Sequence, residues 1–349
     1  MEFEEDIPEG CIPTHGSVPP LFLMNRYPEL APRARELLDD LRLVQNAVRK
    51  ALQYLDHHVT APHKPTQKED GTLTIPEDQA AQDIILSHIR EKYPNDGFLA
   101  EEDVREGLDK PRIWIVDGLD GTHEFIAGRK SYASAVALAE RGRVLVSVIG
   151  RPQIEDERES LFYAVRGVGA FKNGEPLNVR SHWNNIGLER ARGVTHKWVL
   201  ETLRRKGLGE GSAYILDGHS RSREEKALAK KHIFSSEGAG IVDYEAFEEL
   251  QAVERKPRCY QCGSSSATQA AIAEGTLDWY ASMTLKPWDA AAGSLIIEEA
   301  GGKVTTWEGR PRKILSSESF LATNIAIHGE FVRLLYPLLS YSETHASVF

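Results

Sequence analysis

The sequence predicts a mixed α and β fold, in which a β-rich first half is followed by an α/β-like second half. Three observations lead to this prediction. Apolar residues recur at helical spacing from Leu37 to Leu55, strand candidates crowd residues 131–165, and an apolar helix follows Trp288. No internal repeat is apparent, and 349 residues suffice for one large domain or two of ordinary size.

Two helices are expected near the start. Residues 1–33 are rich in proline and glycine and show no period, so we interpret them as an N-terminal extension. From Arg33 the apolar spacing predicts one long helix with a buried stripe. The stripe consists of Leu37, Leu41, Val44, Val48, Leu52 and Leu55. A second amphipathic helix is predicted from about Glu77 to Lys92.

Short strands follow these helices and complete an α+β half, residues 34–180. They are expected at 98–100, 113–116, 131–139, 143–149 and 161–165. The pair Asn173-Gly174 predicts a hairpin turn after them.

Residues 181–349 are expected to form the α/β half. Its first part, 181–256, alternates charged helical runs with glycine-rich breaks, and we interpret it as a substrate-specificity insert. A small-residue helix to about Glu274, a strand at 277–281 and the helix after Trp288 follow. Gly301-Gly302 is typical of a helix C-cap.

The composition excludes several classes of protein. The formal net charge of -10 argues against a nucleic-acid polymer as partner, but local cations can still hold a small phosphorylated substrate. The sequence contains no run of about 18 apolar residues, so no membrane span is expected, and the acidic N-terminus is unlike a signal peptide. Three cysteines cannot form a disulfide framework, so we expect a cytoplasmic protein. The expected assembly is a monomer or a homodimer. Cys259 and Cys262 are interpreted as reduced thiols, because a zinc site needs further ligands and none lies nearby.

The predicted strand at 113–116 ends in the most informative residues of the chain. Asp117 and Asp120 follow it, with Gly121 and Thr122 behind them. Carboxylates at a strand end can bind hard cations, and the backbone N–H groups of the next turn can hold a phosphate.

Further acidic residues recur along the chain. Asp70, Glu101, Glu102 and Asp289 stand near turns or element ends. Taken singly, these motifs have simpler explanations: a turn for Asp120-Gly121, a solvated loop for Glu101-Glu102, and a helix N-cap for Asp289. Taken together, without matching histidines or cysteines, they favour magnesium over zinc. Two Mg²⁺ ions would neutralise the carboxylates and clamp a transferring phosphoryl group.

The joint order of these motifs resembles the lithium-sensitive, magnesium-dependent phosphatase superfamily of inositol monophosphatases and 3'(2'),5'-bisphosphate nucleotidases. The family pattern is Gly-Glu-Glu, then Asp-Pro-Ile/Leu-Asp-Gly-Thr, then Trp-Asp-x-Ala-Ala/Gly-Gly. The chain reads AEE from Ala100, DGLDGT from Asp117 and WDAAAG from Trp288. Two departures are Ala100 for glycine and Gly118 for proline. The resemblance covers roughly residues 35–310 and implies a layered αβαβα sandwich, as in inositol monophosphatases and fructose-1,6-bisphosphatases.

The resemblance also implies roles for individual residues. Glu101, Asp117 and the backbone carbonyl of Leu119 would bind one metal ion, and Asp117, Asp120 and Asp289 a second. Asp70 would assist a third ion and help activate the attacking water, which the Thr122 hydroxyl would orient; Asp70, Glu101 and Thr122 are thus the expected catalytic residues. Contacts to phosphate or substrate are expected from Asp120, Gly121, Thr122, His123, Ser264, Ser265 and Lys286.

Finer details favour the nucleotidase branch. Residues 119–126, LDGTHEFI, are similar to that branch's Leu-Asp-Gly-Thr-Lys-Glu-Phe-Ile, with His123 in place of lysine. Ser282 stands where inositol monophosphatases place a substrate-binding glutamate. Thr268, in contrast, replaces a nucleotidase lysine that could meet a second phosphate.

Three hypotheses follow. The first is a phosphomonoesterase that removes the 3'-phosphate of adenosine 3',5'-bisphosphate, or of its sulfated form, by a metal-activated water. The second is the same chemistry on inositol phosphates, sugar phosphates or other nucleotides. The third is a non-catalytic relative that keeps the fold, which the complete set of matched ligands disfavours.

Overall fold

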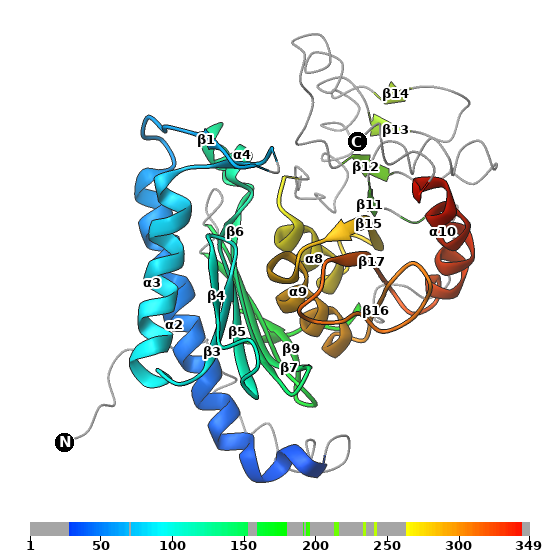
Figure 1. Cartoon of the computed structure of the whole chain (residues 1–349). Helices are drawn as coiled ribbons and strands as arrows, with labels where there is room; N and C mark the ends of the chain where they lie inside the picture. The colour runs from blue at the N-terminus through cyan, green and yellow to red at the C-terminus, as the bar shows by residue number, and fades with distance from the viewer. Residues whose placement is uncertain are drawn as a thin grey trace.

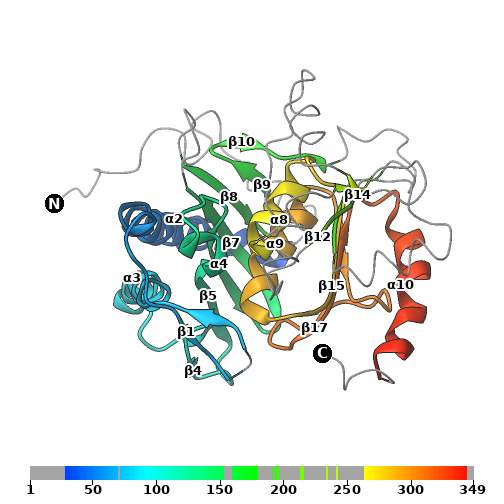
Figure 2. The same ribbon diagram turned by 90° about the horizontal axis from the view of Figure 1, so that it is seen from above.

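The chain folds into five alternating layers of helices and sheets. The computed structural model describes residues 28–69, 71–152, 159–179, 191, 193–195, 213–215, 233–234, 241–242 and 263–343. Figures 1 and 2 show a helix pair, a large sheet, a second helix pair, a smaller sheet and a final helix, in that order. The predicted αβαβα sandwich is thereby confirmed.

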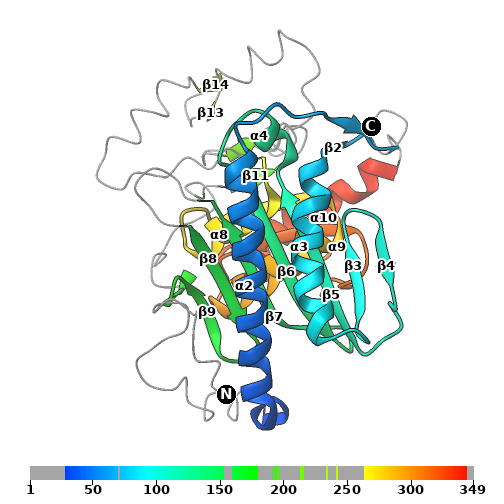
Figure 3. The same cartoon turned by 90° about the vertical axis from the view of Figure 1, so that its left-hand side faces the viewer.

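The first layer consists of two helices that lie against one face of the large sheet (Figure 3). A 3-10 turn, η1 (Pro28–Arg33), leads into α2 (Ala34–His58), and α3 (Pro76–Lys92) follows after a small hairpin of β1 (Thr66–Gln67) and β2 (Leu73–Thr74). All six residues of the predicted apolar stripe are buried in α2. Both helices therefore form because one face of each is apolar and covered by the sheet.

The large sheet has eight strands in the order β10-β9-β8-β7-β6-β5-β3-β4. The strands are β3 (Gly97–Ala100), β4 (Val104–Glu106), β5 (Arg112–Asp120), β6 (Ala133–Glu140), β7 (Arg143–Arg151), β8 (Ser160–Val165), β9 (Gly169–Lys172) and β10 (Glu175–Pro176). Among the described strands of this sheet, β3 and β5 are the pair that runs parallel. The predicted Asn-Gly hairpin joins β9 to β10, with φ of 50° at Asn173 and 93° at Gly174.

Strand β5 is longer than predicted. We expected it to end at Val116, but pairing with β6 resumes beyond a bulge, since Asp117 pairs with Ala135 and Asp120 with Ala133. Three steps along β5 thus match two along β6, which leaves one extra residue in β5. Residues three apart in a regular strand point to opposite faces, and the extra residue brings both aspartates to the same side.

The remaining layers are formed by the second half of the chain. The helices α8 (Ser265–Ala273) and α9 (Pro287–Glu299) lie between the two sheets and are almost entirely buried. The smaller sheet has the order β12-β11-β15-β17-β16, and α10 (His328–Glu343) packs on its outer face. Its strands are β11 (Gly193–Thr195), β12 (Ala213–Ile215), β15 (Trp279–Leu285), β16 (Lys303–Thr305) and β17 (Glu318–Thr323). The described pieces also include α4 (Thr122–Ile126), β13 (Ile233–Phe234) and β14 (Ile241–Val242).

Some predictions fall outside the described residues. Most of the predicted insert at 181–256 does so, as do Asp70, Cys259 and Cys262. Among the residues that are described, no helix combines the length and apolarity that a membrane crossing requires.

A buried histidine joins α10 to the smaller sheet, and its lowered pKa predicts a stability that depends on pH. The ring nitrogens of His328 lie 2.9 Å from the Thr305 hydroxyl and 2.8 Å from the Thr323 hydroxyl. Burial lowers the pKa of His328 from 6.5 to about 4. Between about pH 6.5 and pH 4, His328 is therefore protonated in the unfolded chain but neutral in the folded chain. The folded state accordingly loses stability as the pH falls through this range.

We expect this difference in the His328 pKa to lower the free energy of unfolding by about 1–3 kcal/mol between pH 7 and pH 4.5. The measurement is urea unfolding at both pH values for the wild type and for His328→Gln, whose side chain does not titrate. The variant should lose less stability on acidification than the wild type. Equal losses in the two proteins would show that His328 does not contribute to the pH dependence.

Candidate metal centre

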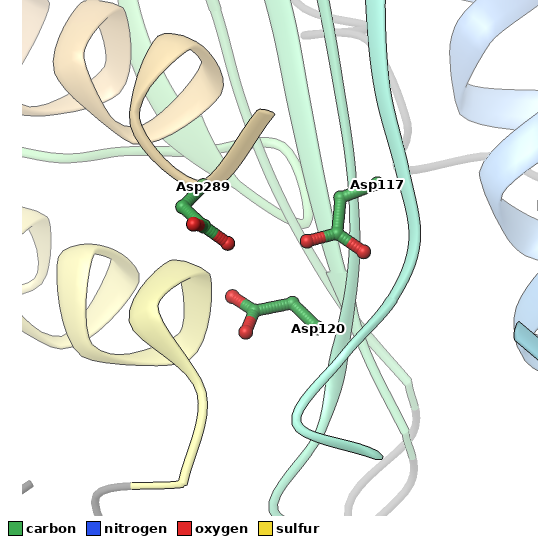
Figure 4. A group of neighbouring side chains, drawn as sticks. All are labelled: Asp117, Asp120 and Asp289. Carbon is green, nitrogen blue, oxygen red and sulfur yellow. The ribbon is translucent and has the colours of Figure 1, made fainter. Parts of the chain in front are cut away.

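Three aspartates from two distant parts of the chain meet where the end of β5 faces the start of α9 (Figure 4). Asp117 and Asp120 come from the bulged end of β5, and Asp289 from the first turn of α9. One carboxylate oxygen of each lies within 4.8 Å of the others (Figure 4). Among the described residues, this is the group suited to hold a metal ion.

Asp289 is placed by the start of α9, though not as expected. The N-cap prediction for Asp289 is wrong, because Lys286 is the N-cap and Asp289 lies inside the first helical turn. Pro287 begins the helix, since its fixed φ and missing N–H suit that position. From the third helical position the Asp289 carboxylate is stabilised by the backbone N–H of Lys286, and its side chain faces β5.

Asp120 is held by the N-terminus of α8. Its Oδ1 accepts a hydrogen bond from the backbone N–H of Ser265 at 3.2 Å, and its Oδ2 accepts one from Ser266. The Ser264 side chain is buried and caps the helix by accepting from the N–H of Ala267 at 3.0 Å. Ser264 and Ser265 therefore border the centre: the Ser264 side chain caps α8 and also stabilises the Asp120 carboxylate, and Ser265 contributes its backbone N–H.

The three carboxylates destabilise one another in the absence of a cation. Burial, and then repulsion from neighbouring carboxylates, raises the pKa of Asp117 and of Asp289 well above the usual value. Burial also raises the pKa of Asp120, although hydrogen bonds from the backbone and the serine side chains at residues 264–266 oppose that effect. Asp117 Oδ2 is buried without a hydrogen-bond partner among the described residues. A hard cation satisfies these oxygen donors and removes the repulsion, so the residues fit magnesium.

The other expected ligands lie beside this group. Glu101 follows β3, and its Oε1 is 3.0 Å from Lys68 Nζ, which also lies 2.6 Å from Glu102. Burial raises the pKa of Glu101, and its charge raises the pKa of Asp117. Glu101 is therefore electrostatically part of the centre while it pairs with Lys68. The carbonyl of Leu119 lies 3.5 Å from the Thr122 hydroxyl.

Thr122 has a partner that sequence reasoning missed. Its hydroxyl donates to Asp78 Oδ1 at 2.9 Å, while Asp78 Oδ2 accepts from the N–H of Ile75 at 2.7 Å. Burial raises the pKa of Asp78 to about 7. An aspartate in the first turn of a helix looks like a capping residue in the sequence. Its second contact depends on where α3 lies relative to α4, which no local pattern shows.

The expected substrate contacts are spread around the turn after β5. Gly121 has φ of 103°, and a Cβ there would lie 3.2 Å from the Ser131 carbonyl, so glycine is required. His123 and Lys286 are exposed. Thr268 is buried and its hydroxyl donates to the Ser264 carbonyl at 2.8 Å, so it faces the interior of the protein.

The layered fold and its oxygen-only cluster define a metal-binding protein of the class predicted from the sequence. The chain belongs to the inositol monophosphatase family, whose model matches residues 36–340. It is thus a phosphatase of that family, a phosphoric monoester hydrolase. The expected magnesium cofactor is confirmed by the family and by the carboxylate cluster, while the number of ions, two or three, stays a prediction.

Characterised relatives cover most of the chain. The Nus factor SuhB of Escherichia coli is 30% identical over 77% of this chain and 85% of its own length. The fructose-1,6-bisphosphatase/inositol-1-monophosphatase of Thermotoga maritima is 29% identical over 74% of this chain and 80% of its own. An inositol-1-monophosphatase of Mesorhizobium japonicum is also 29% identical, over 78% and 86%.

Solved structures share the fold. An IMPase of Thermotoga maritima aligns with a TM-score of 0.66 and 25% identity, covering 87% of this chain and 99% of the other. An IMPase/NADP phosphatase complexed with Mg²⁺ and phosphate aligns with a TM-score of 0.65 and 19% identity, covering 86% and 96%. At that identity the second comparison concerns the fold alone.

Proposed function

We propose that this phosphatase hydrolyses phosphate monoesters with a Thr122–Asp78 pair beside a magnesium centre at Asp117, Asp120 and Asp289. The observation that carries the proposal is the 2.9 Å hydrogen bond from the Thr122 hydroxyl to Asp78. Thr122 lies two residues after Asp120, at the end of the β5 bulge that bears two of the aspartates. Glu101 and the Leu119 carbonyl are further proposed ligands, and Asp70 keeps its predicted role near a third ion.

The pair is suited to take a proton from water. Because the Thr122 hydroxyl donates its only hydrogen to Asp78, its lone pairs are free to accept a hydrogen bond from an attacking water. As the water attacks phosphorus, the ester P–O bond breaks; the proton of the attacking water passes to Thr122 Oγ1 and the threonine proton passes to Asp78, while the leaving ester oxygen takes a proton from solvent water. Magnesium, when bound, supplies the positive charge that activates the water and stabilises the phosphate. The backbone N–H groups of Gly121 and Thr122 are proposed to hold the phosphate oxygens.

The first substrate candidate is adenosine 3',5'-bisphosphate, or its sulfated form, cleaved at the 3'-phosphate. It is supported by the similarity of residues 119–126 to the nucleotidase branch and by the absence of an acidic side chain at Ser282. The missing lysine at Thr268 does not count against it, since that position is buried. His123 and Lys286 are exposed cation candidates for a second phosphate.

The second candidate is an inositol or sugar phosphate. The observation that favours it is the naming of the relatives, two of which are called inositol-1-monophosphatases, one of them also a fructose-1,6-bisphosphatase.

A substrate panel with magnesium separates the two candidates. It contains adenosine 3',5'-bisphosphate, its sulfated relative, adenosine 5'-monophosphate, inositol 1-phosphate and fructose 1,6-bisphosphate, each with a metal-chelated control. We expect kcat/KM for the bisphosphate nucleotides to exceed the others by at least about tenfold, or about 1.4 kcal/mol. Preference for inositol or fructose phosphates would select the second candidate. No metal-dependent phosphate release from any of the five would contradict the proposed function itself.

A further inference from the structure

Gly118 is the point at which α3 rests on the bulge of β5. A Cβ at this position would lie 2.5 Å from the backbone N of Gln82, 2.8 Å from its Cα and 3.0 Å from the carbonyl oxygen of Asp78. The φ of Gly118 is not positive, so glycine is needed here for space and not for backbone conformation. The atoms it would meet are backbone atoms, which cannot rotate away as a side chain can.

The opposite side of Gly118 is fixed as well. Its carbonyl accepts a hydrogen bond of 2.7 Å from the hydroxyl of Ser134, which is fully buried in β6. A side chain at 118 therefore cannot be accommodated by a small shift of β5 alone. To restore ordinary contact from 2.5 Å, α3 has to retreat by about 1 Å.

Two side chains of α3 connect this helix to the candidate centre. The first is the Asp78 carboxylate, which accepts from Thr122. The second is the side-chain amide of Gln82, which is fully buried and hydrogen-bonds both the backbone N–H and the carbonyl of Glu102. Its Oε1 accepts from Glu102 N–H at 2.9 Å, and its Nε2 donates to the Glu102 carbonyl at 3.0 Å. Glu102 adjoins Glu101, so Gln82 fixes the turn that carries a proposed metal ligand.

We propose that Gly118 and Gln82 are positioning residues. Gly118 sets the distance of α3 from β5, and Gln82, through its hydrogen bonds to the Glu102 backbone, makes the position of the Glu101 turn depend on the position of α3. The proposal rests on the proposed function for the roles of Asp78 and Glu101. A displacement of about 1 Å in a catalytic group lowers turnover by about 10²-fold. A residue that orients a metal ligand from outside typically affects metal affinity by about 10–100-fold.

The first experiment compares Gly118→Ala with Gly150→Ala. A Cβ at Gly150 would lie 2.4 Å from Val48 and 2.7 Å from Leu52, so it disturbs the packing of α2, which carries no site residue. We expect Gly118→Ala to lower kcat about 10²-fold with substrate KM within about threefold, while Gly150→Ala loses stability but keeps kcat within about threefold. Equal kcat for Gly118→Ala and the wild type, or equal losses in both variants, would overturn the role of Gly118.

The second experiment needs no substrate and decides the matter if Gly118→Ala does not fold. Magnesium alone is titrated calorimetrically into metal-free wild type, Gln82→Met and Gln79→Met. Gln79 is an exposed residue of α3 that bonds Asp83, so its variant is a matched control. We expect Gln82→Met to weaken the magnesium Kd about tenfold and Gln79→Met to leave it unchanged. Wild-type affinity in Gln82→Met would overturn the proposal, even in a protein that hydrolyses none of the five substrates.

Discussion

Replacing Asp117 with asparagine should abolish catalysis while making the metal-free protein more stable. Asp117 is proposed to touch both metal ions, so we expect kcat/KM to fall by at least about 10³-fold, or about 4 kcal/mol. The fold should be retained, because an asparagine Oδ1 can still accept the 3.1 Å hydrogen bond from Leu119 N–H. Its amide can also donate to the neighbouring carboxylates.

The stability effect follows from the raised pKa of Asp117. A carboxyl whose pKa is raised by folding destabilises the folded state above its unfolded value of 3.8, and protonation relieves this cost as the pH falls. Near pH 7 the metal-free variant should therefore melt at a Tm higher by about 2 °C or more. Calorimetry of chelated samples at pH 7 and pH 5 measures the difference, which should shrink at the lower pH.

A control variant shows whether the effect belongs to the centre. Asp109→Asn removes an exposed carboxylate in the turn before β5 and should change neither activity nor Tm. If Asp117→Asn retained activity, Asp117 would not be a metal ligand. A fall of several degrees in Tm would mean that the carboxylate supports the fold, contrary to the repulsion inferred above.

Replacing Asp78 with asparagine should remove the base and, with it, the acid limb of the pH profile. General-base catalysis contributes about 10²–10⁴-fold, so we expect kcat to fall within that range. Asparagine is nearly isosteric: its oxygen can still accept from Ile75 N–H, while its amide NH2 can donate to Thr122 Oγ1 in place of the bond that Asp78 accepts. Phosphate release under saturating substrate and magnesium measures the change.

The pH dependence has a definite sign. Asp78 accepts a proton only when ionised, and its pKa is raised to about 7 by burial. Wild-type kcat should therefore fall about tenfold per pH unit below that pKa, and bound cations shift the midpoint to lower pH. The Asp78→Asn profile should lack this limb over the same range. An unchanged acid limb in the variant would assign it to another group.

Thr122 variants test whether the two residues act as a unit. Thr122→Ser keeps the hydroxyl and should retain kcat within about tenfold, whereas Thr122→Val should lose as much as Asp78→Asn. The double variant Asp78→Asn/Thr122→Val should be no worse than either single variant, because one proton path is lost in each case. Additive losses would show that the residues contribute separately.

Much of the fold could be predicted because its patterns are local. The stripe from Leu37 to Leu55 repeats at the period of a helix, and the strands near 133–165 are short apolar runs next to turn residues. The end of β5 could not be predicted in this way. Its bulge depends on pairing with Ala133 and Ala135 of β6, and the register between two strands cannot be predicted from local sequence patterns.

The candidate site divides in the same manner. The carboxylates of the cluster stood out in the sequence because oxygen-only ligands near strand and helix ends are typical of magnesium. Asp78 did not, because its local role as a helix cap accounts for its residue type. Gly118, noted in the sequence as a departure from the family's proline, has its explanation in the backbone of α3.

By itself, then, the sequence determined four helices (α2, α3, α8 and α9), six strands (β3, β5 to β8 and β15), the family and the kind of metal, since each depends on residue type and short-range period. Only the tertiary structure decided which oxygens converge, that Thr122 donates to Asp78, and that α3 rests on a glycine. These contacts join residues far apart in the chain, and their distances are set by how closely buried helices and strands pack.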